Sequence, residues 1–270
     1  MMTMKDDNND GLLTFGGHLE VFRKMLFRIL GVAGVIAVVI FCFKDFTWGI
    51  LMAPSEWEFC IYGWLETAMQ AVGIDFHFNE FHVDMIATDL SSQFMTHITT
   101  AVYLGLLGAS PYILYELFRF ISPALYENER RYSVQVAGII YVLFLLGVLM
   151  SYFVLFPISF RFLGTYSVSA KVVSNITLDS YVSTFVSLTL VMGLVFQLPV
   201  ISFFLGKLEF VTSEMLSRYR KHSFLVIMLV AAIITPPDLM TLILVTIPLY
   251  LLYEVSIRVV KWVEPKEAVK

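Results

Sequence analysis

The sequence has 270 residues, of which 58% are hydrophobic and only 15% are charged. Soluble globular proteins average about 45–50% apolar and about 25% charged residues, so a water-soluble fold is excluded because it could not bury this much apolar surface. A formal net charge of −4 argues against a nucleic-acid partner, and the presence of only two cysteines excludes a disulfide scaffold. The composition therefore predicts an all-α, polytopic membrane protein.

Stretches without Asp, Glu, Lys or Arg predict six transmembrane helices, at residues 29–43, 90–115, 132–160, 180–206, 222–237 and 239–253. A spanning helix needs about 20 residues to cross about 30 Å of hydrocarbon. The first stretch reaches this length from Leu26 if Arg28 extends to the headgroups. The last two are short and meet at Pro236-Pro237, which favours two short antiparallel spans over one long kinked span because proline removes backbone donors.

The distribution of basic residues predicts the orientation. With six spans and the N-terminus inside, 15 of the 18 Lys and Arg residues lie in cytoplasmic segments, and only Lys44, Arg161 and Lys171 lie outside. This bias predicts cytoplasmic N- and C-termini in a multi-pass protein of the cytoplasmic (inner) membrane. Residues 1–10 are polar and acidic, so no cleavable signal peptide is expected.

The first outer segment has a composition of its own. Ser55-Glu56-Trp57-Glu58 after Pro54 predicts a capping box that opens a helix. Its apolar face predicts an amphipathic helix at the outer interface and contains Trp57, Ile61, Trp64, Leu65, Ala68 and Val72. Alternation at residues 74–78 is a weak strand signal. We expect a polar N-terminus at 1–17, a six-span domain at 18–262 with this insertion at about 54–84, and a tail at 263–270.

The motifs of soluble enzymes are missing, since the chain has no glycine-rich phosphate loop, zinc-protease motif or Cys-x-x-Cys pair. Residues with metal-binding side chains gather at His77, Glu80, His82 and Asp84, but their spacing matches no defined site. A solvated polar loop is the better interpretation. We therefore expect no enzyme activity, no metal and no cofactor.

The predicted inner loop at residues 116–131 carries three carboxylates, Glu116, Glu127 and Glu129. One interpretation is a solvated loop in which they pair with Arg119, Arg130 and Arg131. The other is a receptor for a basic peptide, because carboxylates bind guanidinium groups in a bidentate manner. Composition alone leaves both open.

Few polar residues lie at membrane depth. Gln197 in the fourth span is followed by Pro199, and Asp238 follows the double proline. Such residues are functional candidates, but an interhelical hydrogen bond explains Gln197 and a helix N-cap explains Asp238. Small residues at 101, 105 and 109 predict close helix packing in the second span.

These residues lie in motifs that resemble TatC, the multispanning subunit of the twin-arginine protein translocase. The strongest match is Ser-Pro-Tyr-Ile-Leu-Tyr-Glu-Leu-Phe-Arg-Phe-Ile-Ser-Pro-Ala-Leu-Tyr-Glu-Asn-Glu-Arg-Arg at residues 110–131. Shorter matches are Met-Ile-Ala-Thr-Asp at 85–89, Phe-Gln-Leu-Pro-Val at 196–200 and Thr-Pro-Pro-Asp at 235–238. The resemblance covers about residues 18–262 in the same six-span plan.

The resemblance implies a cytoplasmic-face receptor for signal peptides that carry two consecutive arginines. It implies that Glu129 binds the arginine pair. It also implies that the loop around Glu129 is shaped by Phe120, Pro123, Leu125 and Tyr126. The resemblance also makes two residues of the family's N-terminal motif, Glu20 and Arg23, candidates for binding the signal peptide. The motif His-Leu-x-Glu-Leu-Arg reads His-Leu-Glu-Val-Phe-Arg here, so its acid, Glu20, stands one position early. One residue turns a helical side chain by about 100°. Intramembrane or assembly roles would fall on Pro111, Gln197, where the family often has Glu, and Asp238.

The resemblance also implies partners and an energy source. These are single-span subunits of the TatA and TatB type, folded cargo proteins with twin-arginine signal peptides, membrane lipid and further copies of the chain, with transport driven by the proton-motive force. The alternative function is an ion-coupled secondary transporter, suggested by Gln197 and by the prolines that interrupt the helices. Such a transporter usually shows an inverted repeat and midplane charges, which this sequence lacks.

Overall fold

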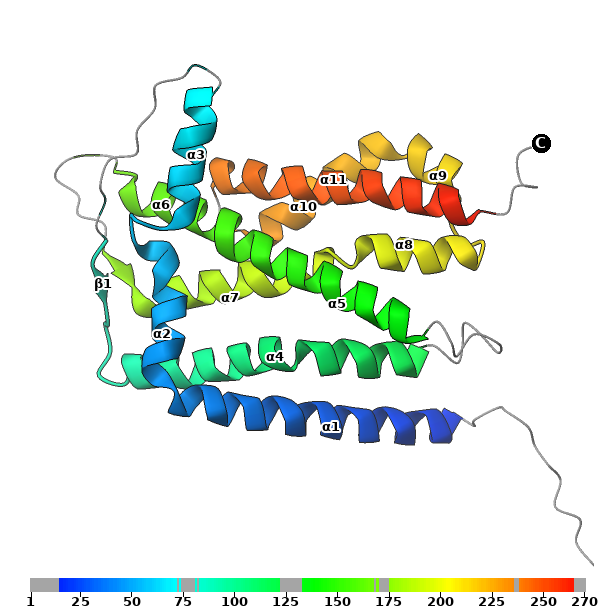
Figure 1. Cartoon of the computed structure of the whole chain (residues 1–270), viewed down its shortest axis with the longest axis horizontal. Helices are drawn as coiled ribbons and strands as arrows, with labels where there is room; N and C mark the ends of the chain where they lie inside the picture. The colour runs from blue at the N-terminus through cyan, green and yellow to red at the C-terminus, as the bar shows by residue number, and fades with distance from the viewer. Residues whose placement is uncertain are drawn as a thin grey trace, which may run out of the picture.

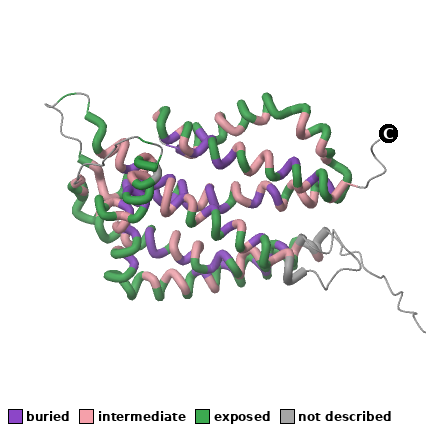
Figure 2. The backbone as a smooth tube through the Cα atoms, turned by 45° about the horizontal axis from the view of Figure 1, so that its top comes forward, coloured by how far each residue is buried: buried purple, intermediate pink, exposed green. Residues whose placement is uncertain are grey.

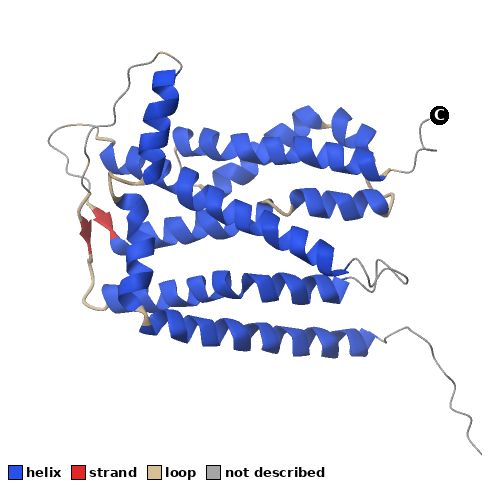
Figure 3. Cartoon of the chain, viewed as in Figure 1, coloured by secondary structure: helices blue, strands red, loops and turns tan. Residues whose placement is uncertain are grey.

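The computed structural model describes residues 15–71, 73, 81, 83–121, 133–167, 169, 175–235 and 238–264. Nearly all of these residues are helical, and within this part of the chain the β-structure is limited to two strands of two residues each (Figure 3). The long helices run side by side along one axis (Figure 1). The predicted all-α class is confirmed.

The elements follow one another with few long connections. In chain order they are α1 (Phe15–Cys42), α2 (Lys44–Met52), a 3-10 turn (Ala53–Ser55), α3 (Cys60–Ala71), β1 (Met85–Ile86), α4 (Ser92–Ile121), α5 (Ser133–Met150), a π-helical turn (Ser151–Leu155), α6 (Phe156–Thr165), β2 (Ile176–Thr177), α7 (Leu178–Val195), α8 (Leu198–Lys207), α9 (Ser213–Arg218), α10 (Arg220–Ile234) and α11 (Leu239–Val263).

Five helical segments of the described chain are long and apolar enough to cross a membrane. They are Leu19–Cys42, Ser92–Phe120, Val136–Thr165, Leu178–Lys207 and Leu239–Val263. The remaining predicted span corresponds to α10, which has 15 residues. The start of α1 and the end of α11 lie at the same end of the bundle (Figure 1), so the chain crosses it an even number of times. This parity favours α10 as the sixth crossing, which stays a prediction.

The end of the bundle that carries the start of α1 and the end of α4 is called the inner end below, after the predicted orientation. The opposite end, with α2, α3 and β1, is called the outer end (Figure 1). The orientation in the membrane itself stays a prediction.

The last helix is longer than predicted. Helix α11 has 25 residues and continues past Tyr253 to Val263, so the expectation of a short final span is wrong. Helix α10 has 15 residues, and its crossing of the membrane stays a prediction. The error for α11 arises because Glu254, Arg258 and Lys261 interrupt the apolar run without interrupting the helix. Charged side chains near the end of a span extend toward the headgroups, so a charge-free stretch underestimates helix length.

Two further boundaries differ from the prediction. Helix α4 continues to Ile121, so residues 116–121 are helical and do not belong to a loop. The predicted fourth span is divided into α7 and α8 by a turn at Phe196 and Gln197. Pro199 lies in the first turn of α8, where its missing N–H leaves no helical hydrogen bond unmade.

The helix of the outer insertion starts later than predicted. Ser55 belongs to the 3-10 turn, and its hydroxyl donates to the Met52 carbonyl at 2.7 Å instead of capping a helix. The capping box is therefore wrong, and α3 begins at Cys60. Helix α2 was not predicted, because it is only nine residues long and begins with Lys44 and Asp45. The predicted strand at 74–78 lies outside the described residues.

The buried face of α3 attaches the insertion to the bundle. Ile61 and Tyr62 are buried, whereas Trp64 is exposed. The Tyr62 hydroxyl donates to the Pro157 carbonyl at 2.9 Å, and the Arg161 guanidinium lies 5.0 Å from the centre of the Tyr62 ring. Burial raises the pKa of the Tyr62 hydroxyl well above its ordinary value, so it stays protonated and remains a donor. A helix is confirmed here, but its predicted apolar face is only partly right, because Trp57 precedes the helix and Trp64 is exposed. The position of α3 at the membrane interface stays a prediction.

The core lies between the helices, toward the outer end. Tyr181 packs edge-on against Phe156 and Phe160, with ring centres 5.0 Å apart in both pairs, and its hydroxyl donates to the Leu51 carbonyl at 2.7 Å. Buried residues line the interior, and exposed residues cover the outside of the helices (Figure 2). Many of the exposed residues are large and apolar, such as Ile233 at 77% exposure. Such a surface is suited to contact with lipid.

The predicted small-residue ridge brings α4 against α1. A Cβ atom added to Gly105 would lie 2.7 Å from the Ala37 Cβ and 2.9 Å from the Ala33 carbonyl oxygen. Real Cβ atoms do not approach other atoms this closely, so the backbones touch because position 105 has no side chain. The prediction of close helix packing is confirmed.

Replacing Gly105 with leucine is therefore expected to separate α1 from α4 and to lower the free energy of unfolding by about 1–3 kcal/mol. Thermal unfolding of the purified protein in one detergent measures this loss. The matched control is Gly34→Leu on α1, where an added Cβ atom meets nothing within 4 Å. Equal melting temperatures for the two variants would contradict the close approach.

Candidate functional site

The residues of the predicted peptide site that the structure describes are Glu20, Arg23 and Phe120, and they lie in the inner parts of α1 and α4. The other residues of this site, Pro123, Leu125, Tyr126 and Glu129, lie outside the described residues, as does Glu127. Phe120 is in the last turn of α4, and its ring centre lies 5.8 Å from that of Phe22 on α1. The structure therefore brings Phe22 of the N-terminal motif next to Phe120, which belongs to residues 116–131, called the acidic segment below.

Two charged residues of α1, Glu20 and Arg23, are candidates for contact with the peptide, and Glu20 pairs with a residue of its own helix. Glu20 forms an ion pair with Lys24, whose Nζ atom lies 2.8 Å from Glu20 Oε1, and both side chains are more than half exposed. Such a pair within one helix contributes little to stability. Arg23 is exposed on the same helix. Glu20 and Arg23 thus lie near Phe22 on α1, and contact of either residue with a peptide stays a prediction.

Sequence reasoning missed the role of Glu116. Its side chain is only 7% exposed, and its Oε1 atom lies 3.2 Å from Arg28 Nη1 and accepts a hydrogen bond from the Tyr112 hydroxyl at 2.9 Å. The expected pairing with Arg119 in a solvated loop is wrong, because Glu116 lies inside α4 facing α1. Arg28 binds this carboxylate, and half of the surface of the Arg28 side chain remains exposed.

A signal for this arrangement exists in the sequence. The pentapeptide Tyr-Ile-Leu-Tyr-Glu that ends at Glu116 reappears as Tyr-Leu-Leu-Tyr-Glu ending at Glu254. There the Arg220 Nε atom lies 2.9 Å from Glu254 Oε1, which accepts from the Tyr250 hydroxyl at 3.2 Å. A tyrosine one turn before an acid at the end of an apolar helix thus marks an interhelical ion pair twice in this chain.

Gln197 forms the expected bond between helices. Its Nε2 atom donates to the Ile140 carbonyl of α5 at 3.1 Å, and the residue is 9% exposed at the turn between α7 and α8. Its Oε1 atom is buried and has no hydrogen-bond partner among the described residues. A buried acceptor without a partner costs free energy, so the bond to Ile140 satisfies the amide only in part.

Asp238 and Pro111 have local structural roles. The Asp238 carboxylate accepts a hydrogen bond from the Thr241 backbone N–H at 2.7 Å, which confirms the predicted N-cap of α11. Pro236 and Pro237, which precede it, lie outside the described residues. Pro111 lies exposed inside α4, where its ring removes one helical hydrogen bond. The assembly roles assigned to these residues stay predictions.

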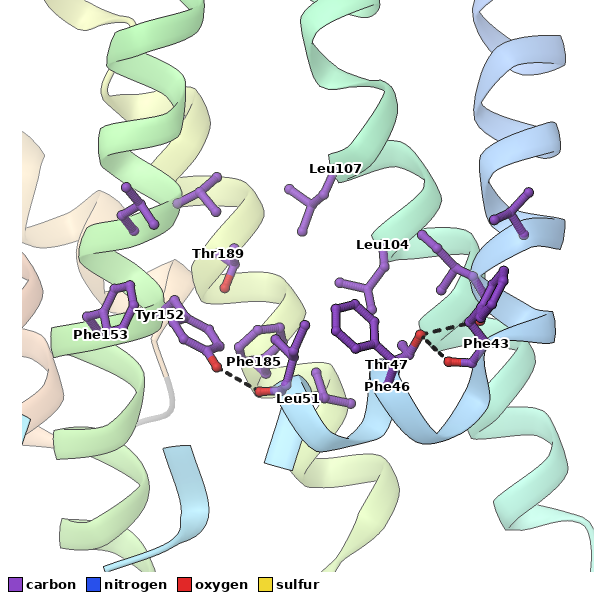
Figure 4. Close-up of a pocket in the computed structure, with 15 residues that line it drawn as sticks. Phe43, Phe46, Thr47, Leu51, Leu104, Leu107, Tyr152, Phe153, Phe185 and Thr189 are labelled. Carbon is purple, nitrogen blue, oxygen red and sulfur yellow. Dashed lines mark hydrogen bonds between the residues drawn. The ribbon is translucent and has the colours of Figure 1, made fainter. Parts of the chain in front are cut away.

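An apolar cavity of about 890 Å³ lies between α1, α2, α4, α5 and α7 (Figure 4). Its three hydrogen-bonding side chains are satisfied within the protein. The Tyr152 hydroxyl donates to the Ile50 carbonyl at 2.8 Å, and the Thr47 hydroxyl donates to the Phe43 carbonyl at 2.9 Å. The Thr189 hydroxyl lies 3.3 Å from the Ser151 hydroxyl, within hydrogen-bonding distance. The cavity therefore suits an apolar guest.

Of the residues weighed as metal ligands, His77, Glu80 and His82 lie outside the described part of the chain. Within the described ranges, no three His, Cys, Asp or Glu side chains gather in a way that could hold a metal ion.

Comparisons with known proteins show the family and the fold of this chain. The family model described as Sec-independent protein translocase protein (TatC) matches residues 17–248. A protein of that name from Blattabacterium is 31% identical over 98% of this chain and 100% of its own length, and one from Carboxydothermus hydrogenoformans is 31% identical over 96% and 97%. A crystal structure titled as the twin arginine translocase receptor TatC superposes with a TM-score of 0.71 at 28% identity, covering 91% of this chain and 99% of its own.

Proposed function

The chain belongs to the TatC family of Sec-independent protein translocase proteins, and on that premise we propose that it captures twin-arginine signal peptides at the inner end of α1 and α4. The contact between Phe22 and Phe120 supports this location most directly, because it joins the N-terminal motif to the base of the acidic segment. The alternative of an ion-coupled transporter is not supported, since the comparisons lead to translocase components.

The chemistry of the ligand explains the acidic segment. Two adjacent arginines bring two permanent positive charges, and each guanidinium can bind a carboxylate through two parallel hydrogen bonds. In our proposal Glu129 binds this pair, and Phe120, Pro123, Leu125 and Tyr126 shape the surrounding loop. Pairing at the membrane surface is stronger than in bulk water, because the effective dielectric constant is lower.

The apolar cavity offers a place for the apolar part of the same peptide. Leu107, which lines the cavity, precedes Phe120 by 13 residues of α4, which is about 20 Å along a helix. The apolar region of a signal peptide has about 7–15 residues, so as a helix it extends for about 10–22 Å. A peptide whose arginines lie at the inner end therefore reaches the cavity when its apolar region has about 13 residues or more.

Photo-cross-linking tests the location. A photoreactive amino acid placed at Phe120 is expected to cross-link to a twin-arginine signal peptide, and one placed at Ile233 on the exposed face of α10 is expected not to. Cross-linking at position 233 without any at position 120 would contradict the proposed site.

The remaining parts of the proposal follow from family membership. We propose that the chain lies in the cytoplasmic membrane with both termini inside, that it assembles with single-span TatA- and TatB-type subunits and with further copies of itself, and that it moves folded cargo with the proton-motive force. The exposed apolar faces of α10 and α11 support assembly within the membrane.

Replacing Gln197 with leucine is expected to disturb partner assembly more than peptide capture. The variant loses the bond that joins the turn between α7 and α8 to Ile140 of α5, whereas the proposed peptide site is formed by α1 and α4. We expect co-purification with the single-span subunits to fall severalfold while peptide affinity changes less than about twofold, which is about 0.4 kcal/mol. The reverse pattern would assign Gln197 to peptide capture.

A further inference from the structure

Glu116 is the one charged residue among the buried residues of the described chain. A buried carboxylate costs free energy unless it is paired and hydrogen-bonded. Here the compensation comes from two places: Arg28 on α1 supplies the counter-charge, and Tyr112, one turn earlier on α4, supplies a neutral donor. Arg28 and Glu116 are 88 residues apart in the sequence, so this is a tertiary contact between α1 and α4.

The pair lies about one helical turn from the contact between Phe22 and Phe120 in the proposed peptide site. Tyr112, Glu116 and Phe120 follow one another at intervals of four residues and therefore share one face of α4. Two of the three contact α1, Glu116 through Arg28 and Phe120 through Phe22. The small-residue approach at Gly105 is about 16 Å farther along the helix, so the ion pair is a separate contact with α1, nearer the inner end of α4.

Resting on the proposed function, we propose that Glu116 is a positioning residue for peptide capture. Its ion pair with Arg28 fixes the rotation of the inner end of α4 against α1. That rotation orients Phe120 in the last turn of α4. Glu116 itself does not touch the peptide, because its side chain is buried and its charge is already neutralised.

Four variants of the full chain test this role in nanodiscs with a fluorescent twin-arginine peptide. Glu116→Gln is expected to weaken peptide binding about tenfold. Arg28→Glu combined with Glu116→Arg reverses the pair, and is expected to restore the affinity to within about threefold of wild type. Tyr112→Phe keeps the ion pair and is expected to weaken binding about twofold. The matched control is Glu254→Gln, which breaks the equivalent pair with Arg220 and should leave the affinity unchanged.

The reversed pair separates positioning from contact with the ligand. If Glu116 bound the peptide arginines directly, an arginine at that position would repel them, and the reversed variant would bind more weakly than Glu116→Gln. That result would overturn the proposal, as would wild-type affinity for Glu116→Gln or an equal loss for Glu254→Gln. If Glu116→Gln fails to fold, the reversed pair and Tyr112→Phe decide the question.

The melting temperature of each variant is measured in the same nanodiscs. A purely structural role predicts that affinity falls only as far as the folded fraction falls. If Glu116 positions Phe120, the Glu116→Gln variant is expected to bind the peptide more weakly than wild type even when it is fully folded. Glu129→Gln, measured in parallel, separates the proposed function from the positioning role. Wild-type affinity for Glu129→Gln would contradict the proposed function. A loss of affinity in Glu129→Gln with none in Glu116→Gln would contradict the positioning role alone.

Discussion

Replacing Glu129 with lysine is expected to abolish detectable capture of a twin-arginine peptide, with a loss of affinity of at least about 100-fold, or about 2.7 kcal/mol. The change removes a bidentate acceptor and places a like charge beside two guanidinium groups. Glu129→Ala removes only the attraction and is expected to cost about tenfold. Equilibrium binding of a labelled peptide to the purified protein measures both.

Glu20 provides the matched control for this effect. Its carboxylate is already paired with Lys24 on an exposed surface, so Glu20→Gln is expected to reduce affinity less than Glu129→Gln does. An equal loss in the two variants would show that the acid on α1 also faces the peptide, despite its displacement by one position from the family motif.

The second large effect concerns the ligand. A peptide in which Lys-Lys replaces Arg-Arg keeps both charges but loses the planar, bidentate geometry of guanidinium. Its affinity for the wild-type protein is expected to fall about tenfold or more. The same substitution should change little in Glu129→Ala, because the carboxylate that distinguishes the two side chains is gone. Equal affinities of the two peptides for the wild-type protein would mean that charge alone is recognised.

The long spans could be predicted from the sequence because lipid imposes a length and a composition that no other constraint overrides. Errors arose where a helix continued past a charged residue. Glu116 was assigned to a loop because an acid at the end of an apolar run resembles a boundary, and its neutralising partner, Arg28, lies on another helix. Only tertiary packing brings the two together.

Short elements escaped prediction for a different reason. Helix α2 has too few residues for an apolar period, and β1 and β2 are two residues each, paired in parallel between segments about 90 residues apart. By contrast, the N-cap at Asp238 and the contact at Gly105 were predictable, because each depends on one residue type at a defined position in a helix.

The location of the acidic segment on the cytoplasmic side is the claim on which the proposed capture depends, and cysteine accessibility at position 126 tests it most directly. Both native cysteines, Cys42 and Cys60, are replaced with serine first, and Tyr126→Cys is introduced into the otherwise cysteine-free chain. In intact cells we expect a membrane-impermeant maleimide to leave this cysteine unlabelled, and in inverted membrane vesicles to label it. Labelling in intact cells with protection in inverted vesicles would place the segment outside, where it could not receive a peptide that arrives from the cytoplasm.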